Sequence, residues 1–407
     1  MGQWKRIKLG DVIIDLIGGG TPSTKEENYW NGNIPWMTSA HITSKEIFTG
    51  QRKISETGLK ESATKLIPKN SLLIASRVGI GKAAINRIDV AISQDLTGVI
   101  LDNSRIQPEY VYWWLALNQN KLKSLAQGST IKGILKEDFA KLELELPSLN
   151  IQKEISNILN LVDEAIQKAD EAIEHTERLK QGLMQKLLTE GIGHTEFKET
   201  KIGRIPKEWE VMELHNSILE MKNGFASGKR DIAGVVQIRM NNVSTEGRIN
   251  FDKYLKVPKI TNYKQYILVE DDFIFNNTNS IDLVGKSSVF KSAPFECVFS
   301  NHFTRIRFNK EIILPQYVLY HFILLWKTKH FQSLAIRHVG QAAVNSNYLL
   351  KMLLPFPSIK EQRKIVDIIQ NVENRVLFEK RRKNQFEQIK QGLMNDLLTG
   401  KKRVTLN

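Results

Sequence analysis

The chain has 407 residues and a formal net charge of +14, with 58 Lys and Arg against 44 Asp and Glu. A hydrophobic share of 41% is enough to form cores, which excludes wholesale disorder. The apolar runs are too short to cross a bilayer, and the single cysteine, Cys297, excludes internal disulfides and Cys-rich zinc sites. We therefore expect a cytoplasmic protein of two or three domains without membrane contact, and its charge favours a polyanionic partner such as nucleic acid.

Residues 1–146 are expected to form a first globular part that mixes short strands with helices. Residues 71–77 and 90–92 are rich in β-branched side chains and predict strands, whereas the aromatic-rich residues 110–124 predict a helix. The two adjacent tryptophans of this helix lie at a spacing that favours burial in a core over stacking on bases.

Residues 147–190 predict one long helix. Pro147 stands at its entry, where proline is tolerated, and no proline follows inside the pattern. Apolar side chains recur every seven residues, with a second set three residues further along, so four heptads present a helix-pairing face. The first set comprises Ile155, Val162, Ala169, Thr176 and Leu183, and the second comprises Ile158, Ala165, Ala172 and Leu179. The stripe is widened by Leu159, Ile166 and Ile173.

A polar, glycine-punctuated linker is expected at residues 191–204. It is followed by a second globular part at 205–355 and a second long helix at 356–403. Within the second globular part, residues 273–275 and 297–299 predict strands.

An internal repeat relates the two halves of the chain. Residues 146–189 match residues 356–399 without a gap, and 15 of the 44 positions are identical. Each copy begins with Pro-Ser, carries a glutamine five residues after the proline (Gln152 and Gln362), and ends in Lys-Gln-Gly-Leu-Met. Weaker echoes relate the globular parts, so the order is globular part, helix, globular part, helix.

Charge favours pairing of the two helices with each other. Residues 152–190 carry 5 bases and 8 acids, whereas residues 362–400 carry 8 bases and 5 acids. Opposite net charges favour pairing, and the alternative is that each helix packs only on its own domain. At about 1.5 Å per residue, such helices are long enough to act as a spacer. Because the helices cancel in charge, the excess of basic residues lies on the globular parts.

The Lys-Gln-Gly-Leu-Met segments contain glycines that cost helix stability and leave room for another helix to approach. Two interpretations are open: docking of a partner subunit, or close packing within this chain. The candidate docking residues are Lys180, Gln181, Gly182, Leu183 and Met184, together with Lys390, Gln391, Gly392, Leu393 and Met394.

Polar loops between the expected strands carry side chains suited to base edges, since Asn and Gln pair with adenine and Arg or Lys with guanine. Any single one is more simply a solvated loop residue, but their clustering in two basic parts favours contact with double-stranded DNA, mostly with its backbone. The candidates are Thr38, Ser39, His41, Arg77, Lys82 and Ser129 in the first half, and Arg230, Arg239, Asn241, Asn242, Asn276, Asn277 and Lys286 in the second.

No motif for catalysis is complete. The glycines at 79 and 81 fit a loose dinucleotide fingerprint, but the residues that follow predict a strand where that motif needs a helix. Gly285-Lys286-Ser287 lacks the upstream glycine of a phosphate-binding loop, because position 280 is serine. We therefore predict a chain that is not an enzyme and that binds no cofactor or metal ion itself.

These features together resemble the specificity subunits of type I restriction-modification systems. Residues 203–209, Gly-Arg-Ile-Pro-Lys-Glu-Trp, are similar to the sequence that opens a domain in that family, and the two repeated stretches are similar to its paired helical regions. The resemblance spans essentially the whole chain, although Trp4 at the first entry lacks the preceding Ile-Pro. Because reading loops vary widely in such families, no base-contact residue is carried over.

The resemblance implies an α+β fold in which two target recognition domains are each followed by a long helix, and the helices pair as an antiparallel coiled coil with pseudo-twofold symmetry. Each domain would read one part of a bipartite, asymmetric DNA site. Two methyltransferase subunits, which bring S-adenosylmethionine, would dock on the helices and receive a base that leaves the stack. Restriction subunits that translocate and cut DNA, with ATP and Mg²⁺, would complete the complex.

Three alternatives stand beside this expectation. A coiled-coil adaptor for protein partners would show no salt-dependent affinity for DNA. A self-contained DNA-modifying enzyme would need the catalytic motifs that are missing. A related reader in another defence or modification system would use the same fold with different enzymes.

Overall fold

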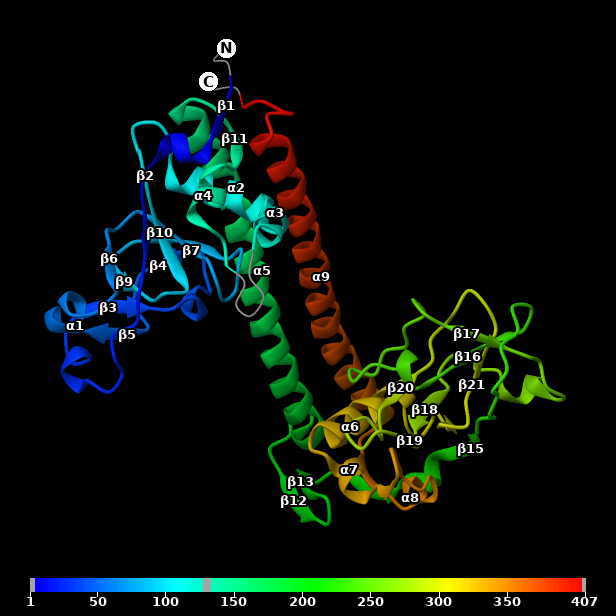
Figure 1. The fold of residues 1–407 in the computed structure, drawn as a ribbon. Coiled ribbons are helices and arrows are strands. Elements are labelled where there is room, and N and C mark those ends of the chain that lie inside the picture. The colour runs from blue at the N-terminus through cyan, green and yellow to red at the C-terminus, as the bar shows by residue number, and fades with distance from the viewer. Residues whose placement is uncertain (1–3, 127–132, 405–407) are drawn as a thin grey trace. The chain divides into compact units, whose positions relative to one another are not determined.

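The chain folds into two compact units in a computed structural model that describes residues 4–126 and 133–404. Unit 1 comprises residues 1–171 and 379–407, and unit 2 comprises residues 172–378. Each unit contains one globular head and about half of each long helix, α5 (Leu149–Glu190) and α9 (Ile359–Leu398) (Figure 1). In the described parts of the chain, no helix is long and apolar enough to cross a membrane.

In its described residues, the first head, which is the part of unit 1 that precedes α5, contains two larger sheets, one pair of strands and four short α-helices. The larger sheet has the strand order β2 (Ile13–Gly18), β10 (Leu96–Leu101), β7 (Leu72–Ala75), β8 (Ala83–Asn86) and β4 (Glu46–Ile47). The smaller has the order β5 (Arg52–Ile54), β3 (Ile34–Met37), β9 (Val90–Ile92) and β6 (Lys65–Ile67), and β1 (Lys5–Lys8) pairs with β11 (Glu143–Leu146). The helices are α1 (Glu56–Lys60), α2 (Pro108–Leu117), α3 (Gln119–Ser124) and α4 (Lys136–Ala140).

The second head, the part of unit 2 between α5 and α9, repeats this plan. Its larger sheet has the order β15 (Ile218–Asn223), β22 (Phe303–Phe308), β18 (Phe273–Asn276) and β20 (Ser287–Val289), and its smaller one β17 (Leu255–Val257), β16 (Val235–Ile238) and β21 (Cys297–Phe299). Further pairings join β14 (Glu210–Glu213) to β25 (Leu353–Phe356), and β19 (Thr278–Asn279), β24 (Gln341–Ala343) and β23 (Ile336–His338) in that order. Its helices are α6 (Pro315–Lys327), α7 (His330–Leu334) and α8 (Asn347–Leu350).

The register of one parallel strand pair relates equivalent residues in the two heads. In the first head β3 and β9 pair in parallel, with Met37 opposite Ile92. In the second, β16 and β21 pair in parallel, with Ile238 opposite Phe299. In both heads the residue that follows each of these strands therefore occupies a corresponding place. The four strands predicted from β-branched and apolar runs are confirmed as β7, β9, β18 and β21.

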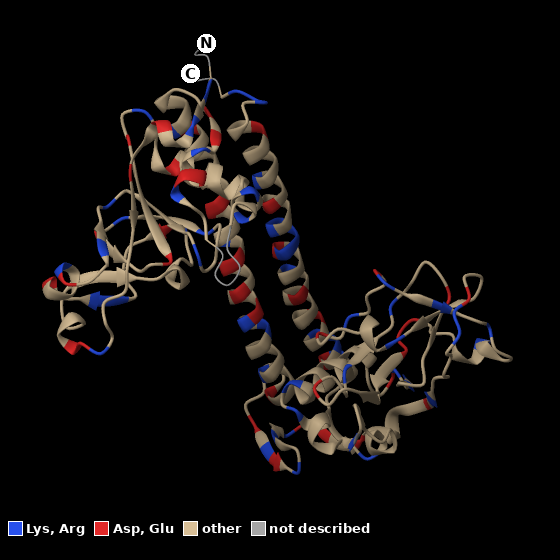
Figure 2. Cartoon of the chain, viewed as in Figure 1, with Lys and Arg blue, Asp and Glu red and all other residues tan. Residues whose placement is uncertain are grey.

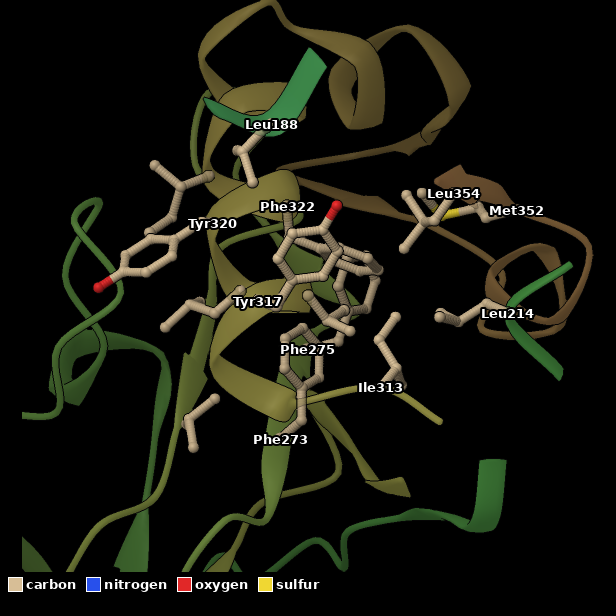
Figure 3. Packing of buried hydrophobic residues seen from close by; sticks show 14 of the residues in the cluster. Leu188, Leu214, Phe273, Phe275, Ile313, Tyr317, Tyr320, Phe322, Met352 and Leu354 are labelled. Atoms are coloured by element: carbon tan, nitrogen blue, oxygen red, sulfur yellow. The ribbon is translucent and has the colours of Figure 1, made fainter. Parts of the chain in front are cut away.

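Aromatic side chains fill the core of each head, as predicted for the tryptophan pair of α2. Trp113 and Trp114 are 1% and 4% exposed. In the second head, Phe273 and Phe275 of β18 pack with Tyr317 of α6, and Leu188 near the end of α5 joins the same cluster (Figure 3). The last turns of α5 are thereby fastened to the second head by burial of apolar surface.

A buried glutamine fastens the start of each long helix to its own head. The Gln152 side chain accepts a hydrogen bond from the Gln107 backbone N–H at 2.9 Å and donates to the Arg105 carbonyl at 3.0 Å. Gln362 forms the equivalent bonds, accepting from the Leu314 N–H at 2.9 Å and donating to the Ile312 carbonyl at 3.0 Å. This explains why the repeat retains glutamine five residues after each proline: a side chain with both donor and acceptor satisfies a backbone N–H and a backbone C=O together.

The stretch predicted as a linker is ordered more than its composition indicates. The strands β12 (Phe197–Thr200) and β13 (Gly203–Pro206) form a hairpin. The carboxylate of Glu361 accepts hydrogen bonds from the Trp209 indole N–H and the Ile192 backbone N–H, each at 3.0 Å, and lies 2.8 Å from His194 Nε2. These long-range contacts hold the segment to the start of α9, and no local sequence pattern announces them.

The long helices pair in antiparallel fashion in both units. In unit 1, Lys390 Nζ lies 2.7 Å from Asp163 Oδ1, and Lys383 Nζ lies 2.7 Å from Asp170 Oδ1. In unit 2, Lys180 Nζ lies 3.0 Å from Glu373 Oε1. A step forward on α5 is matched by an equal step back on α9, and both signs of charge occur on both helices (Figure 2). The predicted electrostatic pairing is thereby confirmed.

The seam between the helices differs in one detail from the heptads read from the sequence. Leu179, expected in the second apolar set, is 47% exposed, whereas the neighbouring Lys180 is only 8% exposed. Leu159 and Ile166, which are seven residues apart, are buried in the seam, and Lys180 lies two heptads beyond Ile166 in the same set. The lysine takes an inward position because Glu373 on α9 offsets its charge there.

Candidate nucleic-acid interface

Loops at the ends of the central strands gather the polar side chains of each head. In the second head, the Phe225 backbone N–H donates to the Phe299 carbonyl at 3.4 Å, and the Asn277 N–H donates to the His302 carbonyl at 3.0 Å. In the first head, the Gly20 N–H donates to the Ile92 carbonyl at 3.0 Å, and the Ser76 N–H to the Asp95 carbonyl at 3.0 Å. In the first head, the end of β9 and the turn after it are thereby bonded to the segment after β2 and to the loop after β7. In the second head, the end of β21 and the turn after it are bonded in the same way to the segment after β15 and to the loop after β18.

Several predicted contact residues are accessible at or near this edge. Arg77 and Lys82 are exposed in the first head, and Arg230 and Asn241 are exposed in the second. These four side chains are free to reach a phosphate or a base edge.

Three further candidates are half-buried and partly committed to internal bonds. The Thr38 hydroxyl donates to Gln51 Oε1 at 2.9 Å, and a ring nitrogen of His41 lies 3.2 Å from the Thr49 carbonyl. Arg239 Nη2 donates to the Ser227 carbonyl at 3.0 Å. Ser129 lies outside the described residues.

Four predicted polar contacts are framework residues instead. Asn242 is 4% exposed, and its amide donates to the Asn250 and Lys253 carbonyls at 2.9 Å. Asn276 is fully buried, and its amide donates to the carbonyls of two loops. Asn277 donates to the Thr304 hydroxyl at 3.0 Å, and the Ser39 hydroxyl donates to the Asp95 carboxylate. Since a buried polar group pairs internally, these four are better assigned to holding the loops than to reading bases.

Lys286 departs most from the expectation. It is 7% exposed, and its ammonium donates to the Val243 carbonyl at 2.6 Å and the Met240 carbonyl at 3.0 Å. Desolvation by burial lowers the pKa of this lysine, partly offset by Glu246. Lys82 takes the equivalent place in the first head, directly before β8, and is exposed. The two lysines were expected to act alike, but only Lys82 is available to a phosphate.

A polar pocket of about 330 Å³ lies at this edge of the second head. Its lining includes Arg239, Ser300 and His302. Burial, and the positive charge of Arg239, lower the pKa of His302, so this imidazole is neutral near pH 7. Neither Ser300 nor His302 was among the predicted contact residues, because nothing in their local sequence pattern marks them as pocket residues.

The helical segments proposed for docking divide into an inner and an outer set. Met184 and Met394 are buried in the cores of unit 2 and unit 1, and Lys180 and Lys390 form the cross-helix ion pairs. Leu183 and Leu393 are partly buried. The remaining residues, Gln181, Gly182, Gln391 and Gly392, are exposed.

The two helical glycines face open space. A Cβ added at Gly182 or Gly392 meets no atom within 4 Å among the described residues. Close packing within this chain, one of the two interpretations of these glycines, is thereby contradicted. What remains is an exposed Gln-Gly step on each helix, backed by a buried methionine.

In the described residues, no group of three or more His, Cys, Asp or Glu side chains is placed to hold a metal ion. The single cysteine is buried in the second head, and burial raises the pKa of its thiol to about 12, so Cys297 stays protonated near neutral pH.

The family model for the type I restriction modification DNA specificity domain matches residues 1–175 and 206–388, and the chain belongs to this family. The MjaVIII and MjaIX specificity subunits of type I restriction enzymes from Methanocaldococcus jannaschii are similar over 99% of this chain. They are 26% and 24% identical to it over 93% and 94% of their own lengths.

Solved structures show the same fold. The S subunit of a type I restriction-modification system from M. genitalium superposes with a TM-score of 0.59 at 14% sequence identity, covering 99% of this chain and 97% of that one. A chain from a study of complex assembly and conformational transition of the type I R-M system superposes with a TM-score of 0.60 at 14% identity, with 98% of each chain covered. The expected α+β fold with two helices packed together is confirmed.

Proposed function

We propose that this chain is the DNA-reading subunit of a type I restriction-modification complex and that it is not catalytic. Its two heads read the two parts of a bipartite, asymmetric site. The observation that carries the proposal is that the heads share one strand register yet present different side chains at corresponding loop positions, such as Thr38 and Arg239. Two heads that share a backbone arrangement but carry different side chains in their loops are suited to a DNA site whose two halves differ in sequence.

The paired helices set the distance between the half-sites in this proposal. Residues 1–146 and 205–355 are the target recognition domains, residues 147–190 and 356–403 the helical regions, and residues 191–204 the linker. Each helix is fixed to its own head by a buried glutamine, and the two helices pair through ion pairs. A head that is fixed on a stiff rod keeps its register along a duplex, as half-site spacing follows from scaffold geometry in other DNA readers.

The exposed Gln-Gly steps on α5 and α9 are the proposed docking sites for two methyltransferase subunits. Because the steps belong to the sequence repeat, two copies of one partner find the same surface twice. The partners supply S-adenosylmethionine and adenine methylation, and restriction subunits supply ATP- and Mg²⁺-dependent translocation and cleavage. The complex acts in the cytoplasm, and this chain binds none of these cofactors itself.

Methylation mapping tests the proposal. The chain is expressed together with candidate methyltransferase subunits from the same genome, and methylated adenines are mapped in the DNA of the host cell. We expect one bipartite motif with unlike halves. Exchange of residues 205–355 for the corresponding head of a related subunit should change one half of the motif and leave the other half and the gap intact. A motif that is continuous, or that changes in both halves, would contradict the assignment of one head to each half-site.

A further inference from the structure

The polar pocket of the second head contains hydrogen-bonding atoms that the protein leaves unused. Within the described residues, Arg239 Nε, Ser300 Oγ and His302 Nδ1 are buried atoms without a hydrogen-bond partner, and all three residues line this pocket. Ser300 is 4% exposed, so water has little access to its hydroxyl. Because unpaired buried polar groups cost free energy, three of them around one pocket indicate a ligand that pairs with them.

At the corresponding place in the first head, the polar side chains are already hydrogen-bonded to one another. Strand register aligns Thr38 with Arg239, Ser93 with Ser300, and Asp95 with His302. In the first head, Ser93 donates its hydroxyl to the Asp95 carboxylate, which also accepts from the Ser39 backbone N–H at 3.0 Å.

In both heads, a side chain at the equivalent strand position donates to the equivalent backbone carbonyl beneath this place. The Trp36 indole N–H donates to the Gly20 carbonyl at 3.3 Å, and the Gln237 amide donates to the equivalent Phe225 carbonyl at 2.9 Å. One frame is thus retained while the groups around the pocket change in charge and pairing. That is the pattern expected where two heads meet different bases, and a purely structural pocket gives no reason for it.

The pocket is suited to a ligand edge that presents two hydrogen-bond acceptors and carries little negative charge. Among the described residues that line the pocket, Arg239 is the only arginine or lysine, and its guanidinium is oriented by the bond from Nη2 to the Ser227 carbonyl. The neutral His302 ring and the Ser300 hydroxyl can each donate or accept. Guanine presents N7 and O6 as adjacent acceptors in the major groove, which is the edge that arginine recognises, whereas a phosphate is better served by several cations.

We propose that this pocket reads a guanine in the half-site of the second head, with Arg239 as the specificity-determining residue and Ser300 and His302 as supporting contacts. This assignment rests on the proposed function of the chain as a DNA reader. Both Ser300 and His302 lie on the turn after β21, so a base contact there is braced by the parallel pair of β16 and β21.

Selection from a pool of DNA duplexes with randomised sequence tests the pocket. The full chain and its variants are incubated with the pool at one fixed salt concentration, and the retained duplexes are sequenced. For Arg239→Ala we expect the preference for guanine at one position of one half-site to fall about 10- to 100-fold, with all other positions unchanged. Ser300→Ala should weaken the same preference less, and its unfolding midpoint should stay the same or rise, because the hydroxyl has no internal partner to lose.

Lys310→Ala is the matched control. Lys310 is exposed, pairs with Asp271, and follows the end of β22 that is remote from the pocket. The Lys310→Ala substitution removes one positive charge from the same head, and we expect the sequence preferences of this variant to be those of the unchanged protein.

Each other outcome has a definite meaning. If Arg239→Ala weakens binding to all sequences equally and reduces the salt dependence by about one ion, Arg239 contacts a phosphate and the guanine pocket is wrong, while DNA recognition by the chain stands. A lower unfolding midpoint for Ser300→Ala would show that its hydroxyl supports the fold, and would remove it from the site. If the unchanged chain enriches no sequence from the pool, the proposed function itself fails.

Discussion

Lys82 and Lys286 occupy equivalent positions in the two heads, but Lys286 contributes to stability and Lys82 is available for DNA binding. The Lys286 ammonium satisfies two carbonyls in the interior of the second head, while Lys82 reaches solvent in the first. Lys286→Ala should lower the free energy of unfolding of unit 2 by about 1–3 kcal/mol, because the Met240 and Val243 carbonyls lose their donor. Lys82→Ala should leave stability within about 0.5 kcal/mol of the unchanged protein and reduce DNA affinity alike for all sequences.

Chemical denaturation measures the first effect, and titration with duplex DNA at several salt concentrations measures the second. The two variants act as controls for each other, since each removes one lysine directly before an equivalent strand. Equal loss of stability in both variants would contradict the division of roles.

A buried histidine makes the second head sensitive to acid. His321 of α6 is 7% exposed, its ring packs 4.7 Å from that of Tyr317, and burial lowers its pKa to about 3. In the unfolded chain a histidine takes up a proton near pH 6.5. The unfolded state therefore binds more protons than the folded state between about pH 6.5 and 3, and stability falls as the pH falls through this window.

His321→Phe should flatten that part of the stability profile. Unfolding midpoints measured between pH 7 and pH 4 should fall less for this variant than for the unchanged protein. His175→Phe, at an exposed site on α5, is the control and should leave the slope unchanged. An identical slope in His321→Phe would show that other groups cause the acid sensitivity.

At the scale of single elements, the glutamine bonds explain how a long helix keeps its direction relative to its own head. Gln362→Leu should lower the free energy of unfolding of unit 2 by about 1–3 kcal/mol, because the Leu314 N–H and the Ile312 C=O lose their partner in the interior. Asn371→Leu, at an exposed position on the part of α9 that belongs to unit 2, controls for replacing an amide side chain by leucine. Denaturant unfolding curves compare the two, and equal curves would contradict a fastening role for Gln362.

The exposed glycines on the helices allow a test of docking that leaves the fold intact. Gly182→Ala should raise helix stability by about 0.5–1 kcal/mol, since no atom lies within 4 Å of the added Cβ. Gly182→Arg should also fold, but it should block capture of the methyltransferase on that helix in a co-purification assay. Loss of thermal stability in Gly182→Arg, or undiminished capture, would contradict a docking role for this step.

At the scale of the whole molecule, the helices determine the gap between half-sites in the proposed mechanism. Removing residues 168–174 from α5 together with residues 379–385 from α9 takes two turns from both helices in matched register. At about 1.5 Å per residue this shortens the pair by about 10 Å, or about three base pairs of a duplex. We expect the mapped gap to shorten by about that amount while both half-sites keep their sequences. An unchanged gap would exclude the helices as the spacer.

Patterns that depend on neighbouring residues could be predicted from the sequence. Heptads, opposite helix charges and β-branched runs predicted the paired helices and four strands, because these preferences act over a few residues. The offset of one residue at Lys180 escaped prediction, since an inward lysine is favoured only when an acid on the facing helix is in place. The burial of loop side chains was the feature least accessible to prediction. The exposed Asn241 and the buried Asn242 have the same local sequence signal.

The sequence by itself determined the duplication, the two long helices and their opposite charges, and the membership in a family of DNA specificity subunits. Only the tertiary structure decided which polar residues face solvent, because burial depends on strands and turns that lie far apart along the chain. It separated Lys82 from Lys286 and brought Arg239, Ser300 and His302 to one pocket. The reason is physical: periodicity is a property of neighbours, whereas a pocket is made by residues that meet only after the sheets have formed.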